Sequence, residues 1–348
     1  MKRIIVIGTI DETHTNISGQ YDRTEIIKEG LTNKGYDVDF INMMNWQRNP
    51  IKLFASITKG YMKTDAVVFL ASLNGTRVIL NTLSALSIIK KKPVYQIAIG
   101  GQSNFMFVQG SSWYRKKVSQ LSGVFVEVES MIDDYKTVGL TNVHYLPNCK
   151  EVNIVPDCID NAGLKEPYRF CTYSRVTPEK GIAEAIGVVE ELNREYGREY
   201  CTLDIYGTYL EEDKKWFHEL MSKATAAITF KGRIERKNSI SILSQYDLML
   251  FPTQHTGEGV PGGMIDCYEA GLPIVTCDTS YMTRIVHDGK TGFIFKRGDN
   301  DDLKKKIQEY TDRMDMDSKK RLRVECQNEA LKYDTESVIN TLSEYIET

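Results

Sequence analysis

The feature that most constrains the fold of this 348-residue chain is a regular alternation of short apolar runs with amphipathic stretches. Twelve runs, rich in β-branched and aromatic residues, follow one another: RIIVIG, DVDFIN, AVVFLA, PVYQIAI, GVFVEV, VHYLP, YRFCTYS, TLDIYG, AAITFKG, LMLFP, PIVTC and GFIF. Strands that alternate with helices form parallel sheets with helices on both faces. Twelve strands at this length predict two doubly wound α/β domains, and an eight-stranded barrel is the alternative.

Cysteine usage and the amino terminus bound the environment. The seven cysteines have no CxxC spacing and no histidine cluster at ligand spacing, which disfavours both a zinc site and a disulfide framework. The run MKRIIVIGT is much shorter than the about 20 apolar residues of a membrane span. A cytoplasmic protein is therefore expected, and any membrane contact would be peripheral.

Charge is distributed unevenly along the chain. Residues 1–150 contain 18 Lys and Arg and 12 Asp and Glu, which gives a net charge of +6. Because the whole chain has a net charge of −3, residues 151–348 have a net charge of −9. Between residues 48 and 92, one acid accompanies eight basic side chains: Arg48, Lys52, Lys59, Lys63, Arg77, Lys90, Lys91 and Lys92. Such a stretch predicts contact with anionic lipid, at about 1 kcal/mol per cation near the surface, unless it is a solvated face. Nucleic acid is not expected as a partner, because no binding motif accompanies the patch.

Ligands of parallel α/β sheets bind at the carboxyl ends of strands, so the loops that follow strands are the expected place for a site. After the first strand, Gly8 is not followed by the other glycines of a G-x-G-x-x-G fingerprint, which disfavours a nicotinamide or flavin enzyme. Ser18 and Gly19 open the first helix, where unpaired amides could face a phosphate or a sugar. An ordinary helix start is the alternative.

The stretch YSRVTPEKGIAEAI places two cations, Arg175 and Lys180, around a helix start. Thr177 is expected to cap this helix, with Pro178 at its first position and Lys180 in its first turn. Because the amino end of a helix is positive, cations there are unfavourable unless an anion is bound. Two cations with free amides suit a diphosphate, and two solvated side chains are the alternative.

The stretch GEGVPGGMIDCYEAGLP places two acids eight positions apart. Glu258 falls on a loop, and Asp266 falls one turn inside a helix that should end at Gly271, before Pro273. The pair is expected to accept hydrogen bonds from sugar hydroxyls. Glycosidase carboxylates are a competing interpretation, but simple hydrolysis has no use for the upstream cations. One capping acid and one solvated acid would be the structural alternative.

Taken in order, SGQ, LPNCKEV, SRVTPEKG, YGTYLEED, FKGRI, FPTQHTGEGVPGGMIDCYEAGLPIV and HDGKTGFIF resemble the landmarks of the retaining group 1 (family four) glycosyltransferases of the GT-B fold. The likeness spans nearly the whole chain and is strongest from residue 168 to 296. It implies two Rossmann-like domains facing a cleft: an acceptor-side domain over 1–160 and a nucleotide-sugar domain over 161–330. A final helix over 331–348 would pack back on the first domain.

The resemblance also implies an activity. Related bacterial enzymes build capsular, exopolysaccharide or lipopolysaccharide chains, so we expect metal-independent transfer, with anomeric retention, from a UDP- or GDP-sugar to a hydroxyl of a lipid-linked glycan. No cofactor is expected. A nucleotide-sugar 2-epimerase and a noncatalytic sugar-nucleotide-binding subunit are the alternatives.

The resemblance assigns roles to individual residues. Arg175 and Lys180 would hold the donor diphosphate, Glu258 the donor sugar and Asp266 the ribose; the first three form the expected catalytic set. The other donor-side positions are Ser18, Gly19, Ile234, Gly259, Val260 and Gly262. On the acceptor side stand His14, Gly100 and Gly101.

Two departures from the family pattern stand out. Asp266 occupies a position where the family usually has glutamate, and Ile99 stands where many members have a histidine. Backbone groups of the glycine pair that follows Ile99 could replace that imidazole. His14 and His255, on ligand-side loops, could assist the reaction or be ordinary polar loop residues.

Overall fold

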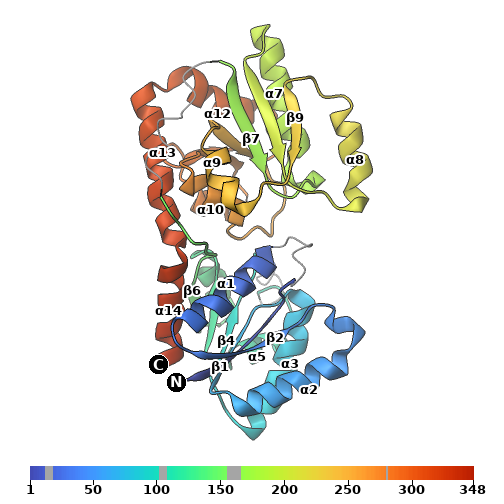
Figure 1. The fold of residues 1–348 in the computed structure, drawn as a ribbon, viewed down its shortest axis with the longest axis vertical. Coiled ribbons are helices and arrows are strands. Elements are labelled where there is room, and N and C mark those ends of the chain that lie inside the picture. The colour runs from blue at the N-terminus through green and yellow to red at the C-terminus, as the bar shows by residue number, and fades with distance from the viewer. Residues whose placement is uncertain (12–18, 102–107, 155–165, 280) are drawn as a thin grey trace. The chain divides into compact units, whose positions relative to one another are not determined.

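The computed structural model describes residues 1–11, 19–101, 108–154, 166–279 and 281–348. The chain divides into two compact units, each built on a six-stranded sheet whose paired strands run parallel (Figure 1). All twelve apolar runs form strands. The prediction of two doubly wound α/β domains is therefore confirmed, and the barrel alternative is wrong.

Unit 1 comprises Met1–Glu151, Gly257–Pro261 and Tyr333–Thr348. Its strand order is β2-β1-β3-β4-β5-β6. The strands are β1 (Arg3–Gly8), β2 (Asp37–Asn42), β3 (Ala66–Phe69), β4 (Val94–Ile97), β5 (Gly123–Val126) and β6 (Val143–Tyr145). The helices are α1 (Gly19–Asn33), α2 (Pro50–Lys63), α3 (Leu73–Ile89), α5 (Ser112–Val118), α6 (Met131–Thr137) and α14 (Thr335–Glu347), with a short turn η1 (Trp46–Arg48).

Both faces of the unit 1 sheet are covered, which explains its nearly continuous apolar strands. Ile4 and Val6 pack in one cluster with apolar residues of α1 and α14. Ile5 points to the opposite face, where a methyl group at Gly60 of α2 would lie 2.2 Å from its Cδ1 atom. The Tyr95 hydroxyl donates to the Tyr345 carbonyl at 2.6 Å. The last helix therefore packs on the amino-terminal unit (Figure 1).

Unit 2 comprises Val152–Thr256 and Gly262–Lys332, with strand order β12-β11-β10-β7-β8-β9. Its strands are β7 (Tyr168–Tyr173), β8 (Cys201–Tyr206), β9 (Ile228–Gly232), β10 (Leu248–Phe251), β11 (Ile274–Cys277) and β12 (Gly292–Phe295). Its helices are α7 (Ile182–Tyr196), α8 (Glu211–Met221), α9 (Ser239–Leu243), α10 (Gly262–Glu269), α11 (Met282–Ile285), α12 (Asn300–Gln308) and α13 (Met316–Ala330). Shorter helical turns are η3 (Pro178–Lys180), η4 (Arg236–Asn238), η5 (Glu309–Arg313) and η6 (Leu331–Tyr333), the last of which ends in unit 1.

The unit 2 sheet is also covered on both faces. Phe170 and Leu250 share a core cluster with apolar residues of α7 and α12. Met249, the residue before Leu250, points the other way and meets Cys267 of α10, with the two sulfur atoms 3.2 Å apart. This alternation fixes which side of β10 carries α10 and hence the placement of Asp266.

One short segment differs from the predicted domain bounds. Residues 257–261 lie within the stretch 161–330 assigned to the second domain, yet they belong to unit 1. The physical reason is a set of hydrogen bonds that tie this segment to residues following β4, β5 and β6.

The predicted helix start at Thr177 also needs correction. Pro178–Lys180 form a separate 3₁₀ turn, and α7 begins at Ile182. Gly181 interrupts the two with a φ of 75°, and the Thr177 hydroxyl makes no capping hydrogen bond. Lys180 therefore ends the turn and does not lie in the first turn of α7, so the expected conflict with the α7 dipole is weaker than predicted.

The predicted end of α10 is confirmed. The helix ends at Glu269, and Gly271 follows with a φ of 66°, its amide donating to the Tyr268 carbonyl at 2.9 Å. A left-handed glycine just past the last helical turn is a common helix stop.

Among the described residues, no helix has both the length and the hydropathy to cross a bilayer. The six cysteines within those residues are buried free thiols. Burial raises the pKa of the Cys149 thiol to about 11, so it is protonated near neutral pH.

Candidate functional site

Several predicted residues lie beyond the carboxyl ends of unit 2 strands, which meet at one edge of a parallel sheet. Arg175 follows β7 and its side chain is exposed. Ile234 follows β9 and is buried. Asp266 lies on α10, which comes after β10. Three predicted site residues, an exposed cation, a buried apolar residue and an acid, therefore follow strands that end at the same edge of this sheet.

Lys180 is not the solvated cation of the alternative interpretation. Its residue is only 7% exposed, and its ammonium group lies 5.5 Å from the centre of the Phe251 ring. Burying an ammonium is costly unless anionic or polar groups surround it. Lys180 is therefore a positioned charge at the sheet edge.

The turn that carries Lys180 is held against the loop after β10. A methyl group at Gly181 would lie 2.1 Å from the Pro252 carbonyl oxygen, so only glycine permits this approach. The Glu179 carbonyl accepts the Gln254 amide at 2.7 Å, and His255 Nδ1 lies 3.3 Å from Glu179 Oε2. These contacts fix the backbone of the turn, and they show His255 beside a carboxylate of unit 2.

Arg297 holds the same loop through different atoms. Its Nε donates to Gln254 Oε1 at 3.0 Å, and its Nη2 donates to the Gln254 carbonyl at 2.7 Å. These two hydrogen bonds join the loop after β10 to Arg297, which follows β12.

Asp266 is 4% exposed and has a defined partner. Its Oδ2 accepts a hydrogen bond from the Tyr173 hydroxyl at 3.1 Å. The helix that carries it starts close to β7, since a methyl group at Gly263 would lie 2.8 Å from the Tyr173 carbonyl oxygen. The end of β7 and the start of α10 thus orient the carboxylate together.

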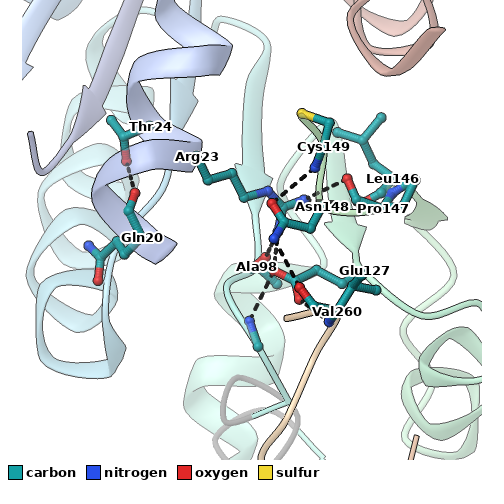
Figure 2. A network of polar contacts seen from close by, with 11 residues as sticks. Gln20, Arg23, Thr24, Ala98, Glu127, Leu146, Pro147, Asn148, Cys149 and Val260 are labelled. Carbon is teal, nitrogen blue, oxygen red and sulfur yellow. Dashed lines mark hydrogen bonds and ion pairs between the residues drawn. The ribbon is translucent and has the colours of Figure 1, made fainter. Parts of the chain in front are cut away.

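The segment Gly257–Pro261, which carries Glu258, lies at the corresponding edge of unit 1. The Gly101 amide donates to the Gly257 carbonyl at 3.0 Å. Glu127 Oε2 accepts the Val260 amide at 2.9 Å, and Asn148 Nδ2 donates to the Val260 carbonyl at 2.9 Å (Figure 2). Glu258 itself is half-buried. The backbone on either side of Glu258 is therefore anchored to unit 1.

Three predicted site positions use their backbone amides inside unit 1. The Val260 and Gly100 amides donate to the Glu127 carboxylate, the latter at 3.2 Å, and the Gly101 amide donates to the Gly257 carbonyl. Each amide has one hydrogen, and in this structure those hydrogens hold the segment.

Comparisons with known proteins bear on the edge of unit 2 in particular. Residues 159–329 match the family model of the glycosyl transferases group 1, and nearly all of them belong to unit 2. Residues 159–329 therefore resemble the group 1 glycosyltransferases. The matched range contains eight of the predicted site residues: Arg175, Lys180, Ile234, Glu258, Gly259, Val260, Gly262 and Asp266.

One curated relative of the group 1 domain is the amylovoran biosynthesis glycosyltransferase AmsK of Erwinia amylovora. It is 24% identical over 141 residues, which make up 39% of this chain and 34% of that protein. This chain therefore matches about a third of the length of that relative.

Solved structures match over the whole chain. HepE of Anabaena in complex with UDP-glucose is 15% identical, with a TM-score of 0.75 and complete coverage of both chains. Sucrose-phosphate synthase from Thermosynechococcus elongatus is 12% identical, with a TM-score of 0.79 over 100% of this chain and 98% of that one. Together with the two parallel sheets, these likenesses identify the fold as GT-B, and the family resemblance of the sequence is confirmed.

The predicted site residues fall into two groups. Arg175, Lys180, Ile234 and Asp266 belong to unit 2, together with Gly262, the first residue of α10. Glu258, Gly259, Val260, Gly100 and Gly101 come together in unit 1, where the exposed Gly19 begins α1. His14 and Ser18 lie outside the described residues. The roles toward donor and acceptor that the resemblance assigns to all of these residues stay predictions.

The sequence analysis did not identify the residues that hold two of the predicted site residues, Glu258 in unit 1 and Asp266 in unit 2. Glu127 and Arg23 hold the Glu258 segment, and Tyr173 contacts Asp266. A signal for Glu127 was present, because an acid directly follows the buried strand GVFV. Arg23 had none, since it sits among ordinary polar residues of an amphipathic helix.

No cluster of three or more His, Cys, Asp or Glu side chains suited to a metal ion occurs in the described parts of the chain.

Proposed function

We propose that this protein transfers a sugar from a nucleoside-diphosphate sugar to a hydroxyl group of a glycan acceptor, in the assembly of a bacterial polysaccharide. The observation that carries the proposal is the coincidence of the group 1 match with unit 2, whose sheet edge holds Arg175, Lys180 and Asp266. HepE, which is similar in fold, binds UDP-glucose in one solved complex, and AmsK acts in amylovoran biosynthesis. The HepE complex favours a donor of the UDP-sugar class, and AmsK favours a role in polysaccharide synthesis.

The chemistry follows from where charge develops. As the bond between sugar and diphosphate breaks, the leaving nucleoside diphosphate gains negative charge, so positioned cations stabilise the transition state more than the ground state. Arg175 offers a planar set of donors suited to phosphate oxygens, and Lys180 offers a buried point charge. Asp266, oriented by Tyr173, is assigned to the ribose hydroxyls, and Glu258 to the donor sugar.

We further propose that the transfer retains the anomeric configuration and needs no metal ion. In this scheme the acceptor hydroxyl gives its proton to a leaving phosphate oxygen on the same face of the sugar. No protein nucleophile is then required, and the carboxylates bind hydroxyls without entering the covalent chemistry. This part rests on the family resemblance.

Product analysis tests the proposal. The protein is incubated with UDP- and GDP-sugars, alone and with alkyl glycosides or a lipid-linked glycan extract, and the products are identified by mass spectrometry. Glycosyl transfer with release of a nucleoside diphosphate is expected. An epimerised nucleotide sugar would support the epimerase, and intact donor under all conditions would support a binding subunit. The anomeric configuration of the product, determined by NMR, tests retention.

A peripheral membrane contact by unit 1 is a second part of the proposal. Helix α2 exposes Ile51, at 80%, and Met62, at 45%, while Lys52, Lys59 and Lys63 are exposed on the adjoining surface of the helix. Apolar side chains beside a row of lysines suit insertion between anionic lipid headgroups.

The structure also shows which cations between residues 48 and 92 could face lipid. Seven of its eight cations are exposed, but Lys92 donates to the carbonyls of Tyr61 and Thr64, and burial lowers its pKa. Lys92 is thus a structural residue and is not expected to face lipid. Flotation with vesicles containing phosphatidylglycerol tests the contact: the wild type should float at low salt, and an Ile51→Asp variant should float less. Failure of the wild type to float at low salt would exclude the contact.

A further inference from the structure

A fully buried ion pair lies at the edge of the unit 1 sheet. Arg23 of α1 and Glu127, the residue after β5, are 1% and 4% exposed, and their side chains are in contact. Arg23 also donates to the carbonyls of Ala98, Leu146 and Pro147 at 3.0 to 3.2 Å (Figure 2). Those carbonyls follow β4 and β6, so the guanidinium joins the ends of neighbouring strands.

The Glu127 carboxylate is divided between two tasks. Its Oε1 faces Arg23 and accepts the Gly100 amide at 3.2 Å, whereas its Oε2 accepts the amide of Val260, which lies 133 residues further along the chain. Arg23 therefore neutralises and orients a carboxylate whose other oxygen holds the segment Gly257–Pro261.

The segment is gripped at one residue from both sides. The Glu127 carboxylate accepts a hydrogen bond from the Val260 amide, and the Asn148 side chain donates one to the Val260 carbonyl, each at 2.9 Å. Next to it, a methyl group at Gly259 would lie 1.8 Å from Glu127 Oε2 and 2.9 Å from the Gly100 Cα atom. The backbone thus rests directly on the carboxylate, and Glu258 is flanked by buried, anchored residues.

We propose that Glu127, held by Arg23, is a positioning residue that fixes the Gly257–Pro261 segment and thereby sets the placement of Glu258 for sugar transfer. This inference rests on the proposed function. A buried ion pair is weak evidence for stability, because desolvation of the two charges offsets most of their attraction. Here the pair does something that an apolar pair of the same volume could not do: it presents an oriented acceptor to a backbone amide.

The variant Glu127→Gln tests the assignment because it keeps the size of the side chain. Glutamine has one acceptor oxygen and one donor group, so it cannot accept from both Val260 and the Arg23 and Gly100 donors. We expect kcat to fall by about 10- to 100-fold, as misplacement of a reacting group by about 1 Å can do. The affinity for nucleoside diphosphate should stay close to that of the wild type.

Two further variants guard against misfolding. Asn148→Ala removes the hydrogen bond to the Val260 carbonyl and leaves both side chains of the ion pair in place. It should therefore also lower kcat, but by less than Glu127→Gln does. Asp247→Asn is the matched control, because Asp247 is a buried acid of unit 2 whose Oδ2 accepts the Arg169 amide at 2.8 Å. It perturbs a buried carboxylate that belongs to unit 2, whereas the segment belongs to unit 1.

Hydrogen exchange supplies a readout that needs no substrate. In Glu127→Gln and Asn148→Ala, the amides of Gly259 and Val260 should exchange faster than in the wild type, whereas they should be unchanged in Asp247→Asn. Unchanged exchange in a folded Glu127→Gln variant would overturn the positioning role, as would unchanged kcat. If the wild type transfers no sugar, the proposed function fails, and the exchange measurement still decides whether Glu127 positions the segment.

Discussion

The carboxyl edges of the two sheets use their polar groups differently. At the unit 1 edge, Arg23 and Glu127 form a buried ion pair, and the amides of Gly100 and Gly101 donate hydrogen bonds to acceptors within the protein. At the unit 2 edge, Arg175 is exposed, and the Asp266 carboxylate accepts a hydrogen bond from the Tyr173 hydroxyl. One edge holds a segment of the chain, and the other presents charged groups of the kind that bind a ligand.

This difference indicates a division of labour. The buried pair at the unit 1 edge fixes the geometry of the chain, whereas the exposed guanidinium of Arg175 at the unit 2 edge suits an anionic substrate. Variants at the unit 1 edge should therefore alter stability and turnover, and variants at the unit 2 edge should alter nucleotide binding. Each prediction below tests one side of that comparison.

The largest effect is expected for Arg23→Met. It leaves the Glu127 carboxylate buried without its guanidinium partner, which should lower the free energy of unfolding of unit 1 by about 3–5 kcal/mol. Urea-dependent hydrogen exchange at unit 1 core amides measures this change. The double variant Arg23→Met/Glu127→Leu removes both charges and should recover part of the loss. A change below about 1 kcal/mol in Arg23→Met would show that the pair does not support unit 1.

At the other edge, Arg175→Ala should lower turnover by about 100-fold or more while leaving the fold intact, because it removes a positioned donor to the diphosphate, which gains charge as the sugar leaves. Steady-state kinetics with the accepted donor measures the effect. Arg194→Ala, at an exposed arginine near the end of α7, is the matched control and should be silent. Equal kinetics in Arg175→Ala and the wild type would remove Arg175 from the site.

A smaller effect is expected for Asp266→Asn. Loss of a charged acceptor for ribose hydroxyls should weaken the affinity for nucleoside diphosphate by about tenfold. Tyr173→Phe removes the hydroxyl that donates to Asp266 Oδ2 and should weaken the affinity less, because the carboxylate remains. Calorimetry measures both. Wild-type affinity in Asp266→Asn would exclude the ribose role.

The smallest effect concerns the pH dependence of unit 2. Burial alone would raise the pKa of Asp312, but hydrogen bonds from Tyr196, Tyr200 and Thr311, together with the charge of Lys319, lower that pKa. A depressed pKa stabilises the fold above the unfolded value of about 3.9, and this contribution is lost as the pH falls through the folded value. The melting temperature of the wild type should therefore fall more steeply below about pH 4 than that of Asp312→Asn. Parallel curves would contradict this linkage.

The sequence predicted the architecture well because buried parallel strands leave a local signature. Twelve apolar runs became twelve strands, and a glycine marked the end of α10. It predicted the contacts of the Glu258 segment poorly. The hydrogen bond between Glu127 and Val260 joins residues 133 positions apart, and no local pattern encodes such a pairing.

The error at Thr177 has a different cause. Thr-Pro-Glu is a good helix start by local preference, but Gly181 must approach the Pro252 carbonyl closely, which forces a left-handed residue into the middle of the expected helix. Tertiary packing therefore overrides local preference at the turn that carries Lys180.

The most direct test of the division of labour is calorimetric titration of UDP and GDP into the wild type, Arg175→Ala and Glu127→Gln. One of the two nucleotides should bind the wild type, lose about tenfold or more in affinity to Arg175→Ala, and bind Glu127→Gln within about twofold of the wild type. Absence of binding to the wild type, or equal loss of affinity in both variants, would contradict the account.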